Sequence, residues 1–435
     1  MISYNNFQNF LIQHILYPCK IEAQGFHIKY STQISDFRHQ LTSYIHNNYF
    51  NLPLGRCIFW FEEPFNENYS FENLPFIYES SIQLYKNKYN GLPLPNSWTG
   101  ATVIRDYPTN FESMGMCNTN GNPEIHVQIL ATSEKSNTLN NWCRKNNFLK
   151  WYFFFHGFQS LNYFNDFKFI DQYYLLEIDQ FVFEKTFCCL NHLLYKSRNY
   201  RLLLLTKMYS NNLTSHGFIS ATTLDHSKIK QDLLDPNSNL SLNAKKEIYN
   251  TWGKKALPLL LDKVDYDIAS ADISIYAYKS LWYLVTETLF FEDKLHLTEK
   301  IFKPIVIKKP FILCSTIGSL DYLRSYGFKT FDRWIDEGYD KESDPEKRLE
   351  MIIVELKKLC SMSKYDLTQM YKEMLPILEH NFNHFYNGFK VQIVDELLNN
   401  FEICLKQYNV GRYTDRFMYS ENLFDKNIVR EILLS

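Results

Sequence analysis

Two short apolar runs that end in polar residues predict neighbouring parallel strands in the second half of the chain. The first run covers residues 281–285 and is followed by Thr286-Glu287-Thr288, and the second covers residues 310–314. Buried parallel strands have this continuous apolar character. Between the runs, Thr298 can cap a helix that begins with Glu299-Lys300. The stretch predicts a β-loop-α-β unit, and such units bind ligands, phosphate in particular, where a strand's carboxyl end meets a helix N-terminus.

The same alternation of strand and helix patterns predicts an α/β fold for the whole chain. Strands are predicted at residues 57–61, 124–130, 149–155, 184–190 and 217–220, and helices at residues 33–49, 137–147, 198–209, 320–326, 348–360, 366–382 and 391–408. The length of 435 residues suits two domains. We expect an α/β domain over residues 1–180, a second over 181–380, and a helical segment over 381–435 that crosses back to the first.

Candidate catalytic bases follow two predicted strands of the first domain. Glu62 and Glu63 come directly after the strand at residues 57–61, so they are either general bases at a strand end or a solvated turn before proline. His156 follows the strand at residues 149–155. Its imidazole can accept a proton near pH 7, or it can be a structural histidine in a tight turn.

Two arginines open the strongly apolar helix predicted after the strand at residues 184–190. Arg198 and Arg201 would lie in its first turn, where cations oppose the helix macrodipole, so a negative group should compensate them. A diphosphate would supply that charge, and carboxylates of the protein are the alternative.

Taken together, these motifs resemble the donor site of inverting fucosyltransferases of the GT-B type. The resemblance rests on the helix start at Arg198 and Arg201, on Glu287 at a strand end, and on Thr298-Glu299-Lys300 in the family's order and approximate separation. It covers residues 186–330. The chain departs from the family pattern in a longer loop between the two glutamates, in Thr288 where the family prefers Asn, and in Pro304 within the helix.

The resemblance implies a GT-B-like α/β fold, with two Rossmann-like domains facing a cleft and C-terminal helices. It implies a glycosyltransferase that moves a sugar from a nucleoside diphosphate sugar to an acceptor hydroxyl, with inversion at the anomeric carbon. No metal and no other cofactor are implied. The sugar, the nucleotide base and the acceptor stay open, and the acceptor could be a glycan, a protein, a lipid or a modified nucleobase.

The resemblance also implies a role for each donor-side residue. Arg201 and Lys300, with Arg198 beside them, would neutralise the departing diphosphate. Glu287 and Glu299 would bind ribose or sugar hydroxyls or orient the lysine. We therefore expect Arg201 and Lys300 to contribute to turnover much more than to stability.

Two other functions fit parts of the sequence. Asp265-Tyr-Asp267 has the Asp-x-Asp pattern with which another class of glycosyltransferases holds a metal and a nucleotide diphosphate. A non-catalytic module that recognises a sugar nucleotide or a glycan would keep the cleft without the reaction. The retained cations and glutamates argue against this module, because burying charge without a use is costly.

Charge and cysteine usage limit the partners and the compartment. The formal net charge of −2 provides no overall basic field for nucleic acid or for a membrane surface. No run of about eighteen apolar residues predicts a membrane span. The nine cysteines form an odd set without C-x-x-C spacing, which indicates reduced thiols and a cytoplasmic protein.

Overall fold

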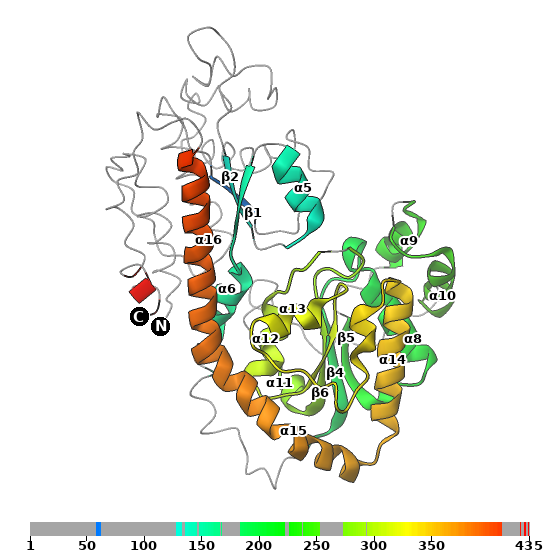
Figure 1. Ribbon diagram of the computed structural model, residues 1–435. Helices are drawn as coiled ribbons and strands as arrows, with labels where there is room; N and C mark the ends of the chain where they lie inside the picture. Colours follow the sequence, from blue (N-terminus) through cyan, green and yellow to red (C-terminus); the bar gives the residue numbers. More distant parts are fainter. Residues whose placement is uncertain are drawn as a thin grey trace, which may run out of the picture. The chain divides into compact units, whose positions relative to one another are not determined.

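The computed structural model describes residues 58–61, 128–132, 135–145, 148–165, 167, 183–221, 226–236, 238–252, 273–292 and 294–410, together with 427, 430, 431 and 434 (Figure 1). The chain forms two compact units, one of residues 1–155 and 394–435 and the other of residues 156–393. Residues 156–165, which we expected in the first domain, therefore belong to the second unit.

The second unit is built on a four-stranded parallel sheet with the order β5-β4-β6-β7. Its strands are β4 (Lys185–Asn191), β5 (Gly217–Ala221), β6 (Ser280–Thr286) and β7 (Phe311–Cys314). Every residue of β6 is buried, as its continuous apolar run predicts for a central parallel strand. The sequence prediction of an α/β fold with parallel strands is confirmed for this unit.

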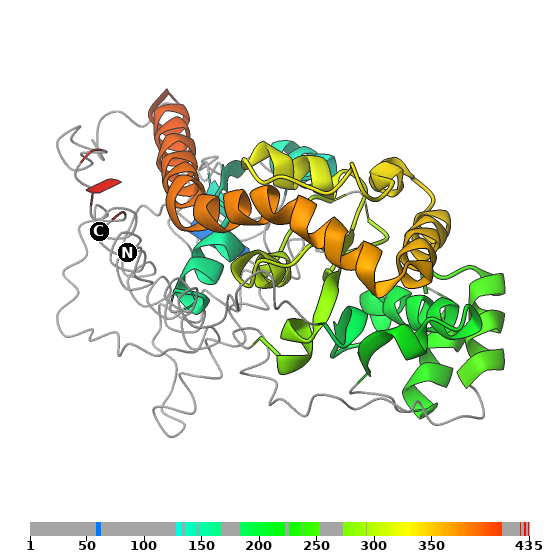
Figure 2. The same ribbon diagram turned by 90° about the horizontal axis from the view of Figure 1, so that it is seen from below.

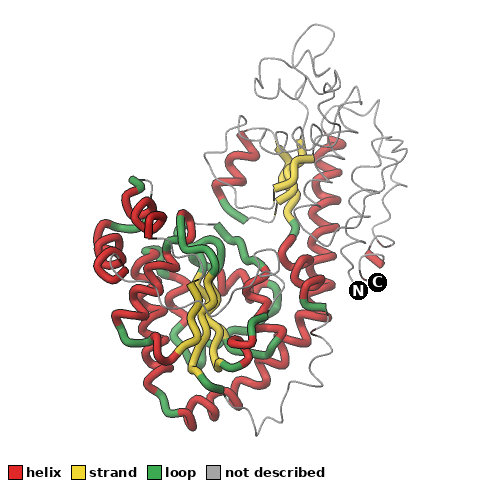
Figure 3. Tube along the Cα trace, turned by 180° about the vertical axis from the view of Figure 1, so that it is seen from behind, coloured by secondary structure: helices red, strands yellow, loops and turns green. Residues whose placement is uncertain are grey.

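Helices cover both faces of this sheet (Figure 3). From β4 the chain passes through α8 (Tyr200–Ser210) to β5, which is one edge strand of the sheet. From β6 it passes through α12 (Glu299–Val306) to β7, which is the opposite edge strand. Right-handed crossovers that leave a strand pair in opposite directions place their helices on opposite faces. Figure 1 shows this arrangement, with α8 on one face and α12 on the other.

The two crossovers diverge between β4 and β6, which makes this pair a topological switch point. In chain order the strands read 2-1-3-4, as in doubly wound nucleotide-binding folds. The strands are joined there by a side-chain hydrogen bond, because Thr286 Oγ1 donates to Asn191 Oδ1 at 2.8 Å. The N-termini of α8 and α12 both follow strands that end at this edge of the sheet.

The remaining helices of the second unit surround this core. The short helix α11 (Ile275–Tyr278) precedes β6, and α10 (Leu242–Trp252) packs on α8 through a hydrogen bond from Trp252 Nε1 to Thr206 Oγ1 at 2.7 Å. The others are α6 (Phe155–Tyr163), α9 (His226–Leu234), α13 (Ser319–Ser325), α14 (Pro345–Ser361) and α15 (Lys364–His384).

Local sequence signals explain several helix ends. Asp344 accepts hydrogen bonds from the first turn of α14 and directly precedes Pro345, the first residue of that helix. Gly327 lies beyond the end of α13 with φ of +86°, a conformation that favours glycine. A π-helical turn (Phe385–Phe389) joins α15 to α16 (Lys390–Val410), and Figure 2 shows α14, α15 and α16 following one another.

The first unit contains a three-stranded parallel sheet of β1 (Ile58–Phe61), β2 (Gln128–Thr132) and β3 (Phe148–Tyr152), in that order. Helix α5 (Asn137–Lys145) connects β2 to β3. The part of α16 within this unit packs against β3, where Asn400 Nδ2 donates to the Tyr152 carbonyl at 2.8 Å. In the described parts of both units, no helix combines the length and the apolar character needed to cross a membrane.

Candidate functional site

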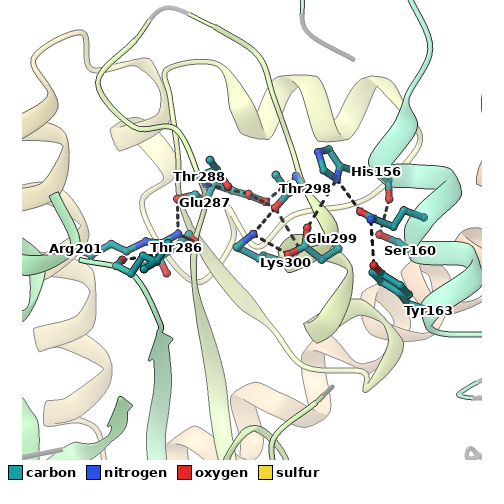
Figure 4. A network of polar contacts seen from close by, with 12 residues as sticks. His156, Ser160, Tyr163, Arg201, Thr286, Glu287, Thr288, Thr298, Glu299 and Lys300 are labelled. Carbon is teal, nitrogen blue, oxygen red and sulfur yellow. Dashed lines mark hydrogen bonds and ion pairs between the residues drawn. The ribbon is translucent and has the colours of Figure 1, made fainter. Parts of the chain in front are cut away.

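A polar network lies at the carboxyl end of β6 and the start of α12 (Figure 4). Glu287 directly follows β6, and its side chain is fully buried. Its carboxylate accepts hydrogen bonds from Thr298 N at 3.2 Å, from Thr298 Oγ1 at 2.6 Å and from Thr288 N at 3.3 Å. Burial raises the pKa of Glu287 above its ordinary value, while Lys300 and Thr298 act in the opposite direction.

Thr298 links this carboxylate to the lysine. It is the N-cap of α12, as predicted, and its hydroxyl accepts from Lys300 N at 3.5 Å and from Lys300 Nζ at 3.1 Å. A hydroxyl has one donor and two acceptor positions, so Thr298 uses its donor on Glu287 and its acceptors on Lys300. The cap that starts the helix therefore also fixes the lysine beside the buried glutamate.

Glu299 is the second buried carboxylate of the network. It is 6% exposed, and its Oε1 accepts from Lys300 Nζ at 2.7 Å. Its Oε2 lies 3.8 Å from His156 Nδ1. Burial opposes ionisation of Glu299, but Lys300 and then His156 outweigh it and lower the pKa of Glu299 to about 2. Glu299 is therefore an anion throughout the neutral range.

His156 occupies the first turn of α6, and this corrects the prediction of a strand end followed by a tight turn. Its Nδ1 lies 2.9 Å from Gln159 Oε1, one helical turn further along. The ring of His296 meets the ring of His156 edge-on, with 5.0 Å between the ring centroids. The structure thus brings the predicted base His156 and the predicted donor-side residue Glu299 into one network, and adds Gln159 and His296, which carry no recognisable motif.

Arg201 is buried and bonds to main-chain carbonyl groups. Its guanidinium donates to the carbonyl oxygens of Leu193 at 3.0 Å, Thr286 at 2.9 Å and Glu287 at 2.9 Å. The hydroxyl of Tyr200 donates to the same Glu287 carbonyl at 2.5 Å. A guanidinium has five N–H groups, so most of those of Arg201 are engaged in joining the end of β6 to the loop after β4.

Arg201 and Lys300 interact with Glu287 from different helices. Arg201 of α8 binds the main-chain carbonyl group of Glu287, and Lys300 of α12 is linked to the carboxylate of Glu287 through the hydroxyl of Thr298. Arg198 lies in a 3-10 turn (Lys196–Arg198) before α8, and this corrects its prediction in the first turn of that helix. Burial lowers the pKa of His192, and the positive charges of Arg201 and Arg198 lower it further. The loop after β4 is therefore a region of positive potential, in agreement with the charge that the sequence predicts there.

The other predicted catalytic and metal-binding candidates lie outside the described residues. Glu62 and Glu63 follow β1 but lie outside the described residues, as do Asp265 and Asp267. Within the described ranges, no three His, Cys, Asp or Glu side chains come together as a metal site. The cysteine thiols of the sheet are buried, and burial raises the pKa of Cys189 to about 12, so its thiol is unreactive.

Comparison with known proteins found no match to this chain among protein-family models, curated proteins or solved structures.

Proposed function

We propose that this chain is an inverting glycosyltransferase of the GT-B type that takes its sugar from a nucleoside diphosphate sugar and needs no metal. The observation that carries the proposal is the network of Glu287, Thr298, Lys300, Glu299 and His156 at the end of β6. It combines a cation, two buried carboxylates and an imidazole at the edge of the sheet where doubly wound folds bind nucleotides.

Lys300 is the residue that we assign to the diphosphate. Its side chain is 31% exposed, so part of it is in contact with solvent. It lies in the first turn of α12, where the helix dipole and the backbone N–H groups also favour an anion. As the bond to the anomeric carbon breaks, negative charge grows on the leaving diphosphate, and a fixed cation stabilises that charge.

The proposed reaction needs one base and one leaving group. The base removes the proton of the acceptor hydroxyl, the oxygen forms a bond to the anomeric carbon, and the carbon–oxygen bond to the diphosphate breaks. The nucleoside diphosphate leaves with the electron pair of that bond. Among the described residues, we assign the base to His156, because the anionic Glu299 beside it stabilises the imidazolium that forms.

Arg201 has a structural role in this proposal, whereas its sequence position led us to expect contact with the diphosphate. It holds the end of β6 in place by binding the Thr286 and Glu287 carbonyl groups, and it adds to the positive potential there. Direct contact with the diphosphate is assigned to Lys300 alone. The resemblance of Thr298-Glu299-Lys300 to the fucosyltransferase signature supports the reaction class and leaves the sugar open.

The proposal is tested by incubating the full-length protein with sugar nucleotides in the presence of EDTA. GDP-fucose, UDP-glucose and UDP-N-acetylglucosamine cover different bases and sugars, and NMR of the anomeric proton follows both hydrolysis and the configuration of the product. We expect one donor to be consumed with inversion. Nucleotide binding without any turnover would instead identify a recognition module.

Two further measurements test the metal-dependent alternative and the role of Lys300. Loss of turnover in EDTA that manganese or magnesium restores would favour the metal-dependent reaction at Asp265 and Asp267. Lys279→Ala is the matched control for Lys300→Ala. Lys279 also pairs with a glutamate, Glu184 at 2.9 Å, but it precedes β6 at the opposite edge of the sheet. Nucleoside diphosphate affinity should fall in the Lys300 variant only.

A further inference from the structure

The ring of His156 is held on one side by two acceptors from different elements (Figure 4). Its Nδ1 lies 2.9 Å from Gln159 Oε1 and 3.8 Å from Glu299 Oε2. Gln159 is itself 6% exposed, and its Nε2 donates to Tyr163 Oη at 3.2 Å. The amide of Gln159 is thus fixed at both ends within α6, because residues 156, 159 and 163 lie on one face of a helix.

These contacts favour one tautomer of the neutral imidazole. A carboxylate only accepts hydrogen bonds, and an amide that gives its NH₂ group to Tyr163 presents its oxygen to His156. An oxygen acceptor at 2.9 Å from Nδ1 requires a proton on Nδ1. In the neutral ring the lone pair then lies on Nε2.

We propose that Gln159 is a positioning residue that holds His156 in the Nδ1–H tautomer and thereby makes Nε2 its proton-accepting atom. The inference deepens the proposed function, on which it depends only for the identity of the hydroxyl that gives up the proton. When Nε2 accepts that proton, an O–H bond breaks, an N–H bond forms and Nδ1 keeps its hydrogen. The product is an imidazolium with both nitrogens protonated.

Gln159 and Glu299 have separate effects on the ring. Gln159 is within hydrogen-bond distance and is uncharged, so it selects the nitrogen that carries the proton. Glu299 is beyond that distance and is charged, so it changes how readily the ring accepts a second proton. Among the described residues, His296 and, on α6 itself, Tyr163 are further titratable groups near the ring, while Lys300 acts through its ion pair with Glu299.

This separation predicts different behaviour for three variants. Gln159→Leu removes the amide and should shift the ring toward the Nε2–H tautomer. Gln159→Glu keeps an oxygen beside Nδ1 and should keep the tautomer, while its added negative charge moves the titration of the ring to higher pH. Glu299→Gln should keep the tautomer and move the titration to lower pH.

The experiment is ¹⁵N NMR of the full-length protein labelled at histidine, without any substrate. The chain has twelve histidines, and the signals of His156 are those that disappear in His156→Gln. Ser160→Ala is the matched control. Its hydroxyl donates to the His156 carbonyl at 2.6 Å, so this variant disturbs the same turn of α6 without touching the ring. We expect the control to keep the Nδ1–H tautomer.

The outcomes separate the inference from the proposed function. A parent protein with the Nε2–H tautomer, or a Gln159→Leu variant with an unchanged tautomer and unchanged titration, would overturn the inference. If a donor is turned over, Gln159→Leu should lower kcat about 10-fold, and Gln159→Glu should restore most of it. The expected tautomers in a protein that consumes no sugar nucleotide would support the positioning role and refute the transferase.

Discussion

The imidazole of His156 and the carboxylate of Glu299 face each other across 3.8 Å, although 143 residues separate them along the chain (299 − 156 = 143). His156 comes from α6, which precedes the four-stranded sheet, and Glu299 comes from the helix between its β6 and β7. A nearby carboxylate stabilises the protonated ring. The charge of Glu299 therefore favours the protonated form of His156, the residue to which we assign the base.

The first prediction concerns the pH dependence of turnover. A base must be unprotonated, so kcat/KM should fall on the acidic side as His156 gains a proton. Glu299→Gln removes the charge that favours the proton, so the acidic limb should move to lower pH. The measurement is kcat/KM against pH for both proteins. An acidic limb that stays in place would show that another group, such as Glu62 or Glu63, is the base.

The second prediction concerns Lys300→Ala. If Lys300 stabilises the leaving diphosphate, as we propose, its loss should lower kcat by ~10²–10³. The structure changes our expectation for stability, because Lys300 pairs with the buried Glu299, and its removal leaves that carboxylate without its closest cation. Since Lys300 is partly exposed, we expect a loss of only about 1 kcal/mol in the free energy of unfolding. Urea unfolding and turnover, measured together with Lys279→Ala, test both parts.

Local signals explain why much of the second unit could be predicted from sequence. The buried run of β6 and the cap at Thr298 are encoded by adjacent residues, and the structure confirms both. The helical position of His156 was harder to predict, because the aromatic residues around it suit a strand as well as a helix. The strand ends at Tyr152, and the helix that contains His156 begins at Phe155. The contact between Gln159 and His156 has no sequence signature, since glutamine is common on helices.

Arg201 shows what local patterns cannot provide. Its sequence position at a helix start predicts an anion partner, but its partners include carbonyl groups at residues 286 and 287, more than 80 positions away. These bonds depend on the pairing of β4 with β6, a tertiary relationship. A pattern of charge along a helix identifies the cation and cannot identify the acceptor that it meets.

The third prediction concerns stability in acid. Burial opposes the charge of Glu299, but Lys300 and His156 lower its pKa from 4.5 to about 2. A carboxyl whose pKa is depressed by folding stabilises the protein above its unfolded pKa and loses that effect as the pH falls through the folded pKa. The protein should therefore lose this stabilisation as the pH is lowered from 4.5 to about 2. The loss amounts to about 3 kcal/mol.

Urea unfolding at pH 6 and at pH 3 measures this effect. The parent protein should lose more stability between these values than Glu299→Gln, which has no carboxyl to titrate. Glu287 has the opposite sign, because burial raises its pKa, and it is present in both proteins. Glu184→Gln, at an exposed carboxyl, is the control and should match the parent. Equal losses in the parent and Glu299→Gln would mean that folding does not lower the pKa of Glu299.

The last prediction is that Arg201→Ala and Arg201→Lys both destabilise the protein. The substitution to alanine leaves the carbonyl group of Leu193 and the carbonyl groups of the buried residues Thr286 and Glu287 without their guanidinium donor. Each such loss is costly, and together they should lower the free energy of unfolding by about 2–4 kcal/mol. Lysine does not restore the effect, because an ammonium group lacks the planar fork that reaches both the loop after β4 and the end of β6.

Arg333→Ala is the matched control for these variants, because Arg333 is 72% exposed and pairs with Glu373 at the surface at 3.6 Å. Its stability should stay within about 0.5 kcal/mol of the parent. Urea unfolding gives the stabilities, and binding of GDP and UDP gives the affinities. If Arg201 positions the end of β6, the folded fraction of the Arg201 variants should bind nucleotide less tightly, because Glu287 and the residues that it orders have lost their support. A stable Arg201→Ala variant with lost nucleotide affinity would instead make Arg201 a direct ligand of the diphosphate, as its sequence position first suggested.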